Sequence, residues 1–292
     1  MSVATATLLI SCLDRKGLVA KIADWLFSHG GNILHADQHT DAIAGLFLMR
    51  VEWELDGFNL TRSEIIPAFA PLAETFDAQW EIHFSDHVRR IAIFVTKQDH
   101  CLYDLILRQR SGEIPATIPL VIGNHAELES VAHNFGINYH HLPITPETKE
   151  VQEAAQLALL QQYKIDLVVL AKYMQVLSPA FLAKFPQVIN IHHSFLPAFP
   201  GANPYQRAYK RGVKIIGATA HYVTQDLDEG PIVEQDVIRV SHRDSVADLI
   251  RKGKDLERIV LARAVRLHLE NRVLVYGSSA NSGLNLRTVV FD

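Results

Sequence analysis

The segment QVINIHHSFLPAFPG, residues 187–201, starts as an apolar strand and continues with an asparagine, two adjacent histidines and a serine. Three earlier segments are also nearly continuous apolar runs: IAIFVT at 91–96, IPLVIGN at 118–124 and IDLVVLA at 165–171. Strands that are buried on both faces of a parallel sheet have this composition. We predict an α/β Rossmann-like domain with a mostly parallel sheet over residues 91–292. Such sheets bind ligands beyond the carboxyl ends of their strands, which is where the two histidines fall.

Residues 5–84 follow another pattern, in which apolar and polar side chains alternate along the expected strands. In GLFLMRVEWEL, residues 45–55, five apolar side chains occupy alternate positions: Phe47, Met49, Val51, Trp53 and Leu55. Alternation indicates an antiparallel sheet that is covered on one face. The order strand, helix, strand, strand, helix, strand predicts an α+β ferredoxin-like domain over residues 1–84. The polar segment SDHVRR, residues 85–90, is the expected linker.

The bulk composition limits the possible partners and compartments. The chain has 292 residues and a net charge of −4, which does not favour a nucleic-acid partner. Its only cysteines, Cys12 and Cys101, are far apart, so neither a disulfide framework nor a thiolate zinc site is expected. The N-terminal segment lacks a basic region, and no run reaches the ~18 apolar residues of a membrane helix. We expect a soluble, cytoplasmic protein with no membrane partner.

A second polar cluster lies in GATAHYVTQDLDEGPI, residues 217–232. If it reaches the same sheet edge, Asn190, His192 and Asp228 converge there. An amide donor, an imidazole and a carboxylate together suit attack on a carbonyl carbon, since two groups stabilise an oxyanion and the third handles a proton. Neighbouring residues of a strand point to opposite sides, so Asn190 and His192 share one side, and His193 turns away or lines the loop beyond.

The two clusters resemble the formyltransferase family that uses 10-formyltetrahydrofolate. The motif NIHHSFLPAFPG, with TAHYVTQDLDEGPI starting 25 residues after Ser194, matches the family's signature. The resemblance assigns the catalytic roles to Asn190, His192 and Asp228, and supporting roles to His193 and His221. It also implies a set of folate-binding residues, among which Asp226 either binds folate or orders its loop: Met174, Val176, Leu177, Ser194, Thr224, Gln225, Asp226 and Leu227.

The resemblance further implies that water is the acceptor of the formyl group. Members that formylate glycinamide ribonucleotide hold its phosphate with a glycine-rich loop after the first strand, but VTKQDHCLYD, residues 95–104, contains no glycine. Members that formylate methionyl-tRNA have a further basic domain, whereas this sequence ends about 60 residues after Asp228. We expect hydrolysis of 10-formyltetrahydrofolate to formate and tetrahydrofolate, without metal or cofactor. The alternatives are transfer to an unidentified amine, a catalytically silent amino-acid sensor, and a metal-dependent hydrolase using His192 and His193.

The N-terminal region resembles ACT domains, which bind amino acids, through DRKGLVAKIADWLFSHGGNI at residues 14–33. The resemblance implies an effector site at Asp14, Gly17 and Asn32, with glycine or methionine as the ligand, and a homo-oligomer formed through both domains. The other interpretation is that Gly17 only opens a helix and Asn32 only starts a strand. Residues 278–286, SSANSGLNL, form an insertion that we expect to be a loop before a last strand.

Overall fold

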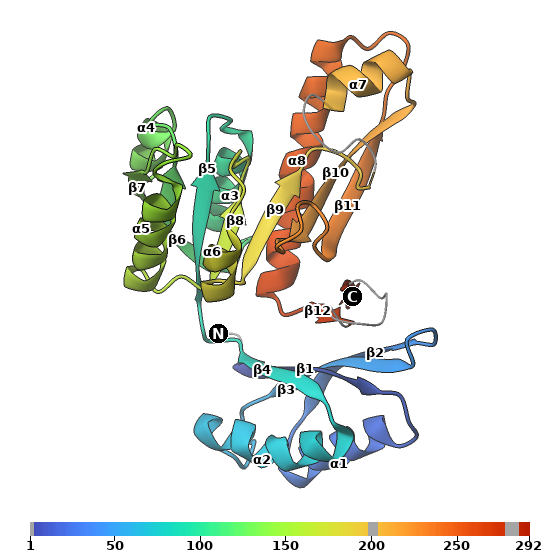
Figure 1. Cartoon of the computed structure of the whole chain (residues 1–292). Helices are drawn as coiled ribbons and strands as arrows, with labels where there is room; N and C mark the ends of the chain where they lie inside the picture. Colours follow the sequence, from blue (N-terminus) through green and yellow to red (C-terminus); the bar gives the residue numbers. More distant parts are fainter. Residues whose placement is uncertain (1–2, 198–203, 278–285) are drawn as a thin grey trace. The chain divides into compact units, whose positions relative to one another are not determined.

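The computed structural model describes residues 3–197, 204–277 and 286–292. The chain forms two compact units, Met1–Val88 with Asn271–Asp292, and Arg89–Glu270 (Figure 1). The boundary after Val88 lies within the predicted linker. The predicted domain over residues 91–292 is wrong at its end, because the residues from Asn271 onward pack with the N-terminal unit.

The N-terminal unit has the predicted order of elements: β1 (Thr5–Leu13), α1 (Leu18–Ser28), β2 (Ile33–Asp41), β3 (Leu46–Glu54), α2 (Arg62–Phe76) and β4 (Gln79–Phe84). They build an antiparallel sheet of order β2-β3-β1-β4, with both helices on one face (Figure 1). Alternation sends Met49, Val51 and Trp53 into the core under the helices, where they meet Ile65 and Phe69. Burial of these large apolar side chains stabilises the unit.

The end of the chain supplies cover for the other face of this sheet. Strands β12 (Val273–Tyr276) and β13 (Arg287–Val290) form a hairpin, and β13 is the expected last strand. Leu274 and Phe291 pack against Leu9 and Leu48, whose side chains alternate away from the helical face. Residues 278–285 of the predicted insertion lie outside the described residues. The hairpin therefore belongs to the N-terminal core, which explains the misplaced domain end.

The second unit is built on a sheet of order β11-β10-β9-β8-β5-β6-β7. Its strands are β5 (Arg89–Val95), β6 (Ala116–Gly123), β7 (Asn138–His141), β8 (Leu167–Leu170), β9 (Val188–His192), β10 (Ile215–Tyr222) and β11 (Ile232–Arg239). Its helices are α3 (His100–Ser111), α4 (Glu129–Asn134), α5 (Lys149–Gln162), α6 (Pro179–Lys184), α7 (Pro204–Arg211) and α8 (Val246–Leu269). Strands β7, β6, β5, β8 and β9 are parallel, and β10 and β11 are antiparallel to their neighbours. The prediction of a mostly parallel sheet is confirmed.

Helix packing completes this unit. The parallel strands contribute fully buried side chains such as Phe94 and Val168 to a core that also holds Phe181 of α6. The long helix α8 buries Val260 and Leu261 on its apolar side. None of the helices among the described residues is long and apolar enough to cross a membrane.

Candidate active site

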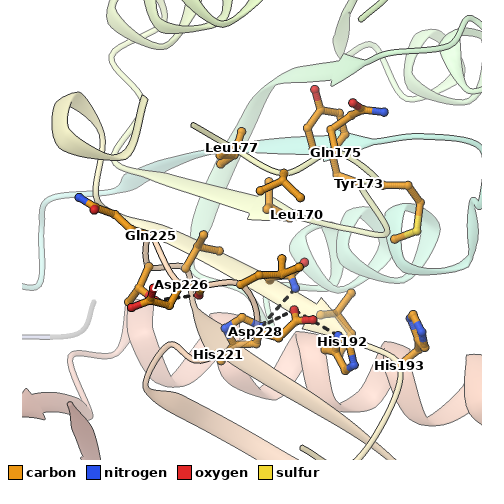
Figure 2. Close-up of a pocket in the computed structure, with 17 residues that line it drawn as sticks. Leu170, Tyr173, Gln175, Leu177, His192, His193, His221, Gln225, Asp226 and Asp228 are labelled. Atoms are coloured by element: carbon orange, nitrogen blue, oxygen red, sulfur yellow. Dashed lines mark hydrogen bonds and ion pairs between the residues drawn. The ribbon is translucent and has the colours of Figure 1, made fainter. Parts of the chain in front are cut away.

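The pairing of β9 with β10 brings the two polar clusters together. In this antiparallel register Asn190 lies opposite His221, and His192 lies opposite Thr219. The loop after β10 then places Asp228 beside His192 at the end of β9 (Figure 2). Asn190 borders the same cavity, so the three residues converge as predicted. These residues border a cavity of about 290 Å³ at the carboxyl end of the parallel strands.

Asp228 is held by the imidazole of His192. The distance from His192 Nδ1 to Asp228 Oδ1 is 3.3 Å, and that from His221 Nε2 to the same oxygen is 3.7 Å. The pKa of Asp228 lies far below its ordinary value, first because His192 donates to the carboxylate and then because of the nearby His221, against the opposing effect of burial. Asp228 is therefore ionised throughout the neutral range.

His221 orients Asn190 from behind. Its Nδ1–H donates to the carbonyl oxygen of Tyr222 at 2.9 Å, which leaves Nε2 to accept from the Asn190 amide nitrogen at 3.2 Å. One amide hydrogen of Asn190 is thus engaged, and the other is left for a group in the cavity. His221 therefore supports the site through Asn190 as well as lying near Asp228.

His192 presents a second nitrogen besides the one that faces Asp228. The side chain is buried, and Nε2 has no hydrogen-bond partner among the described residues. A buried polar atom without a partner is costly in a folded protein and marks a place where a ligand can supply one. A carbonyl oxygen in the cavity would satisfy Nε2 when His192 is protonated.

The loop that carries Asp228 is pressed against β10 at Gly230. A Cβ at Gly230 would lie 1.7 Å from the carbonyl oxygen of Tyr222, so only glycine allows this approach. Asp228 itself has a left-handed backbone with φ of +59°, a conformation that aspartate tolerates better than most residues. The segment DEGP, residues 228–231, therefore fixes the position of Asp228 relative to His192.

The structure corrects the prediction for His193. Its ring stacks on that of His192, with centroids 4.8 Å apart and planes 16° from parallel, and it lines the cavity instead of turning away (Figure 2). Strand β9 ends at His192, so strict alternation does not extend to the next residue. Its Nδ1 lies 3.3 Å from the ammonium of Lys172.

Seven of the eight predicted folate-binding residues line the cavity, together with residues such as Leu170, Tyr173 and Gln175 that complete its wall: Met174, Val176, Leu177, Thr224, Gln225, Asp226 and Leu227. Ser194, the eighth, is buried outside it, where its carbonyl oxygen accepts from Thr219 Oγ1 at 2.8 Å. The prediction that Ser194 contacts folate is therefore not supported by its position. The Asp226 backbone carbonyl accepts from Thr224 Oγ1 at 3.1 Å, which orders the loop.

The predicted effector residues lie on the surface of the N-terminal unit. Gly17 precedes α1 with φ of +91°, so its helix-opening role accounts for the glycine. Asn32 donates to Glu54 Oε2 at 2.7 Å, and the backbone N–H of Asp14 donates to Gly45 O at 2.9 Å. An amino-acid site at these residues stays a prediction.

Sequence reasoning missed the buried charges behind the cavity, above all Lys172 and Glu257. Glu257 belongs to the long helix α8. It follows Gly253 by one helical turn on the apolar side of α8, beside Leu256 and Val260, and that placement is a signal the sequence contains.

The fold and the site together define a formyltransferase-type domain. Residues 89–265 match the family model for formyl transferases. A glycinamide ribonucleotide transformylase 1 from Symbiobacterium toebii has the same fold, with a TM-score of 0.64 and 33% identity over 72% of this chain and 97% of that one.

Two further relatives match along nearly the whole length. A formyltetrahydrofolate deformylase from Synechocystis sp. is 64% identical over 98% of both chains. The crystal structure of a formyltetrahydrofolate deformylase from Pseudomonas syringae pv. tomato has a TM-score of 0.94 and 46% identity, covering 100% of this chain and 96% of that one. The chain belongs to the formyltetrahydrofolate deformylase family.

Proposed function

We propose that this protein hydrolyses 10-formyltetrahydrofolate to formate and tetrahydrofolate in the cavity beside Asn190, His192 and Asp228. Family membership supports the reaction, and the observation that carries the mechanism is the contact of 3.3 Å between His192 and the ionised Asp228. The surface of the cavity, which residues 174–177 and 224–227 help to line, is mostly apolar, which suits a flat ring system.

The chemistry follows from the positions of the three groups. Asn190 Nδ2 and His192 Nε2 donate to the formyl oxygen as it gains negative charge, which lowers the barrier to attack. A water molecule beside Asp228 attacks the formyl carbon and loses its proton to that carboxylate. The bond from carbon to the folate nitrogen then breaks, and His192 protonates the nitrogen. Asp228 then loses its proton to solvent and His192 Nε2 regains one from solvent, which restores the starting state.

The absence of glycine from residues 95–104 supports water as the acceptor. In this segment Asp99 precedes α3, His100 and Cys101 are buried, and Lys97 pairs with Glu127 at 3.1 Å. These side chains occupy the region where a glycine-rich backbone would be needed to wrap a phosphate. A reducing, cytoplasmic setting fits the two buried free cysteines.

Incubation of the purified protein with 10-formyltetrahydrofolate tests the reaction. We expect formate and tetrahydrofolate to appear in equal amounts with no amine present, because water is the acceptor. Addition of glycinamide ribonucleotide should neither accelerate formate loss nor produce a formylated amine. Formyl transfer that depends on an added amine would contradict the hydrolytic assignment and favour the transferase alternative.

For the N-terminal unit we infer a ferredoxin-like ACT module that binds glycine or methionine and pairs subunits. The sheet order β2-β3-β1-β4 with two helices on one face supports the module. Titration calorimetry of the whole protein with each amino acid should give heat for one of them, and Asp14→Ala should abolish it. Equal heats for the wild type and this variant would remove Asp14 from the effector site.

A further inference from the structure

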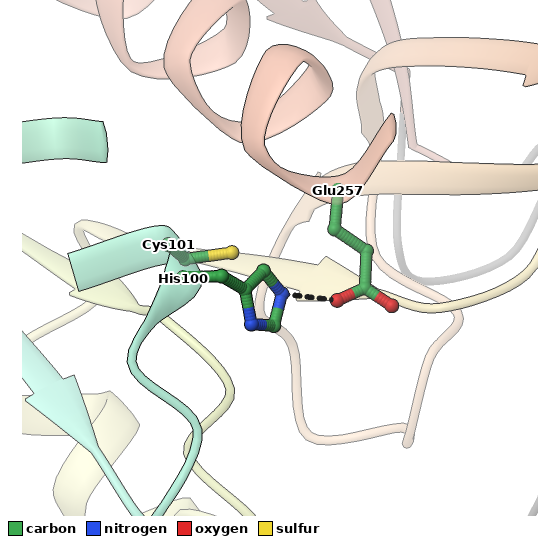
Figure 3. A group of neighbouring side chains, drawn as sticks. All are labelled: His100, Cys101 and Glu257. Carbon is green, nitrogen blue, oxygen red and sulfur yellow. Dashed lines mark hydrogen bonds and ion pairs between the residues drawn. The ribbon is translucent and has the colours of Figure 1, made fainter. Parts of the chain in front are cut away.

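A buried charged cluster lies behind His192 and His193. Glu257 of α8 is 1% exposed, and its oxygens meet His100 Nε2 at 2.7 Å, the hydroxyl of Tyr205 at 2.7 Å and Lys172 Nζ at 3.4 Å. Figure 3 shows His100 reaching from α3 to Glu257 on α8, with Cys101 beside them. Burial alone would raise the pKa of Glu257, but the hydrogen bond from His100 and the charge of Lys172 hold it at about 2. Glu257 is therefore an anion inside the protein.

Three local features that cost free energy meet in this cluster. Lys172 is 4% exposed and has a left-handed backbone with φ of +63°. Gly253 lies inside α8, where glycine costs about 1 kcal/mol relative to alanine. A Cβ there would lie 2.0 Å from the Tyr205 hydroxyl, so the glycine lets Tyr205 reach Glu257. Buried ion pairs often stabilise a protein less than apolar residues do. Stability alone gives no reason for this arrangement, and such features gather at functional sites.

The cluster is connected to the active site through His193. Lys172 Nζ lies 3.3 Å from His193 Nδ1, and the His193 ring stacks on the His192 ring at 4.8 Å. His192 in turn contacts Asp228. A continuous path thus runs from Glu257 through Lys172 and the two imidazoles to the catalytic carboxylate.

A metal ion is another possible occupant, because ligand atoms of His100, Cys101 and Glu257 lie within 4.8 Å of one another (Figure 3). Both Glu257 oxygens already have donors, and the ammonium of Lys172 already supplies the compensating positive charge. Burial raises the pKa of the Cys101 thiol, and the charge of Glu257 raises it further, so the thiolate that a metal prefers is disfavoured. The arrangement therefore fits an ammonium-centred cluster better than a metal site.

We propose that Lys172, anchored by Glu257, keeps His193 neutral with its proton on Nε2 and thereby positions the catalytic imidazole of His192. An ammonium group can only donate, so His193 Nδ1 must accept and cannot be protonated while the contact holds. A second imidazolium stacked on His192 would oppose the positive charge that His192 needs. Lys172 and His193 are thus positioning residues, and their role rests on the hydrolytic function proposed above.

The double variant Lys172→Met/Glu257→Gln tests the proposal, because it removes both charges and leaves no buried ion unpaired. We expect kcat for formate release to fall about 10- to 100-fold through misplacement of His192, with KM within about threefold. His193 can then take up a proton. Within the described part of the chain, the charged or titratable groups facing it are Lys172, Tyr205 and His192, with Glu257 behind Lys172. The high-pH limb of kcat, which reports protonated His192, should therefore move to lower pH.

The His193→Ala variant gives an independent measurement that does not alter the buried ions. We expect a similar fall in kcat. The triple variant Lys172→Met/Glu257→Gln/His193→Ala should have a kcat no lower than that of the double variant, since the three residues act along one path. Arg50→Met/Glu52→Gln is the matched control: it removes an ion pair of 2.8 Å in the other unit and should leave kcat and the pH profile unchanged. Thermal unfolding of each variant shows that the fold is retained.

The outcomes separate this proposal from the proposed function. A wild-type protein that releases no formate overturns the function itself. An active wild type, with a folded double variant whose kcat stays within twofold and whose pH limb does not move, overturns only the role of Lys172 and His193. Independent, multiplying losses in the triple variant would do the same. Loss of activity on chelation, restored by zinc, would assign the cluster to a metal and overturn the proposal too.

Discussion

Replacement of Asp228 by asparagine should lower kcat for formate release by about 10²- to 10⁴-fold, the range in which positioned proton-transfer groups contribute. The amide keeps the size of the carboxylate but neither accepts the proton of water nor stabilises the imidazolium of His192. KM should change little, since the surface of the cavity is mainly apolar. Steady-state formate assays over a range of substrate concentrations measure both quantities.

The pH profile gives a second measurement of the same variant. Asp228 has a strongly lowered pKa, so it stays charged across the neutral range and no limb of the wild-type profile between pH 5 and 9 should come from it. Loss of this anion removes the negative charge that faces the His192 imidazole, so the high-pH limb of kcat should shift to lower pH in the variant. Glu229→Gln, a neighbouring exposed carboxylate, is the control and should behave as wild type. Unchanged formate release by Asp228→Asn would remove Asp228 from the mechanism.

The convergence of the site could be predicted from sequence because it depends on strand ends. Apolar runs locate strands that are buried on both faces, and polar residues after such a run fall at the edge where ligands bind. Asn190 and His192 share a side because β9 is regular up to His192. Asp228 could be joined to them only because the segment before it also forms a strand, β10, whose register sets His221 opposite Asn190.

Other features depend on packing that sequence patterns do not report. The hairpin of β12 and β13 carries the same apolar composition as any short strand pair, and only its contacts with Leu9 and Leu48 assign it to the N-terminal unit. The His193 side chain does not follow the alternation of strand residues, because His193 lies one residue past the end of β9. Nothing in the sequence around Lys172 distinguishes it from a surface lysine. Its burial is explained only by the ion pair that it forms with Glu257 in the structure.

Replacement of His192 by glutamine should lower kcat by about 10²- to 10³-fold, as loss of an oxyanion donor does in other enzymes. Glutamine can still donate a hydrogen bond through its amide, but it cannot carry a positive charge or protonate the leaving nitrogen. The loss should therefore persist across the pH range, and the high-pH limb that reports His192 should disappear. Formate assays from pH 5 to 9 measure both effects, and exposed His242→Gln serves as the control.

The double variant Asp228→Asn/His192→Gln tests whether the two side chains act as one unit. Asp228 and His192 contact each other across 3.3 Å, so removal of either partner also removes the support that it gives the other. Groups that act as a unit are not additive, and the double variant should be no slower than the slower single variant by more than a fewfold factor. Losses that multiply would show that Asp228 activates water independently of His192, and the contact between them would then have no catalytic role.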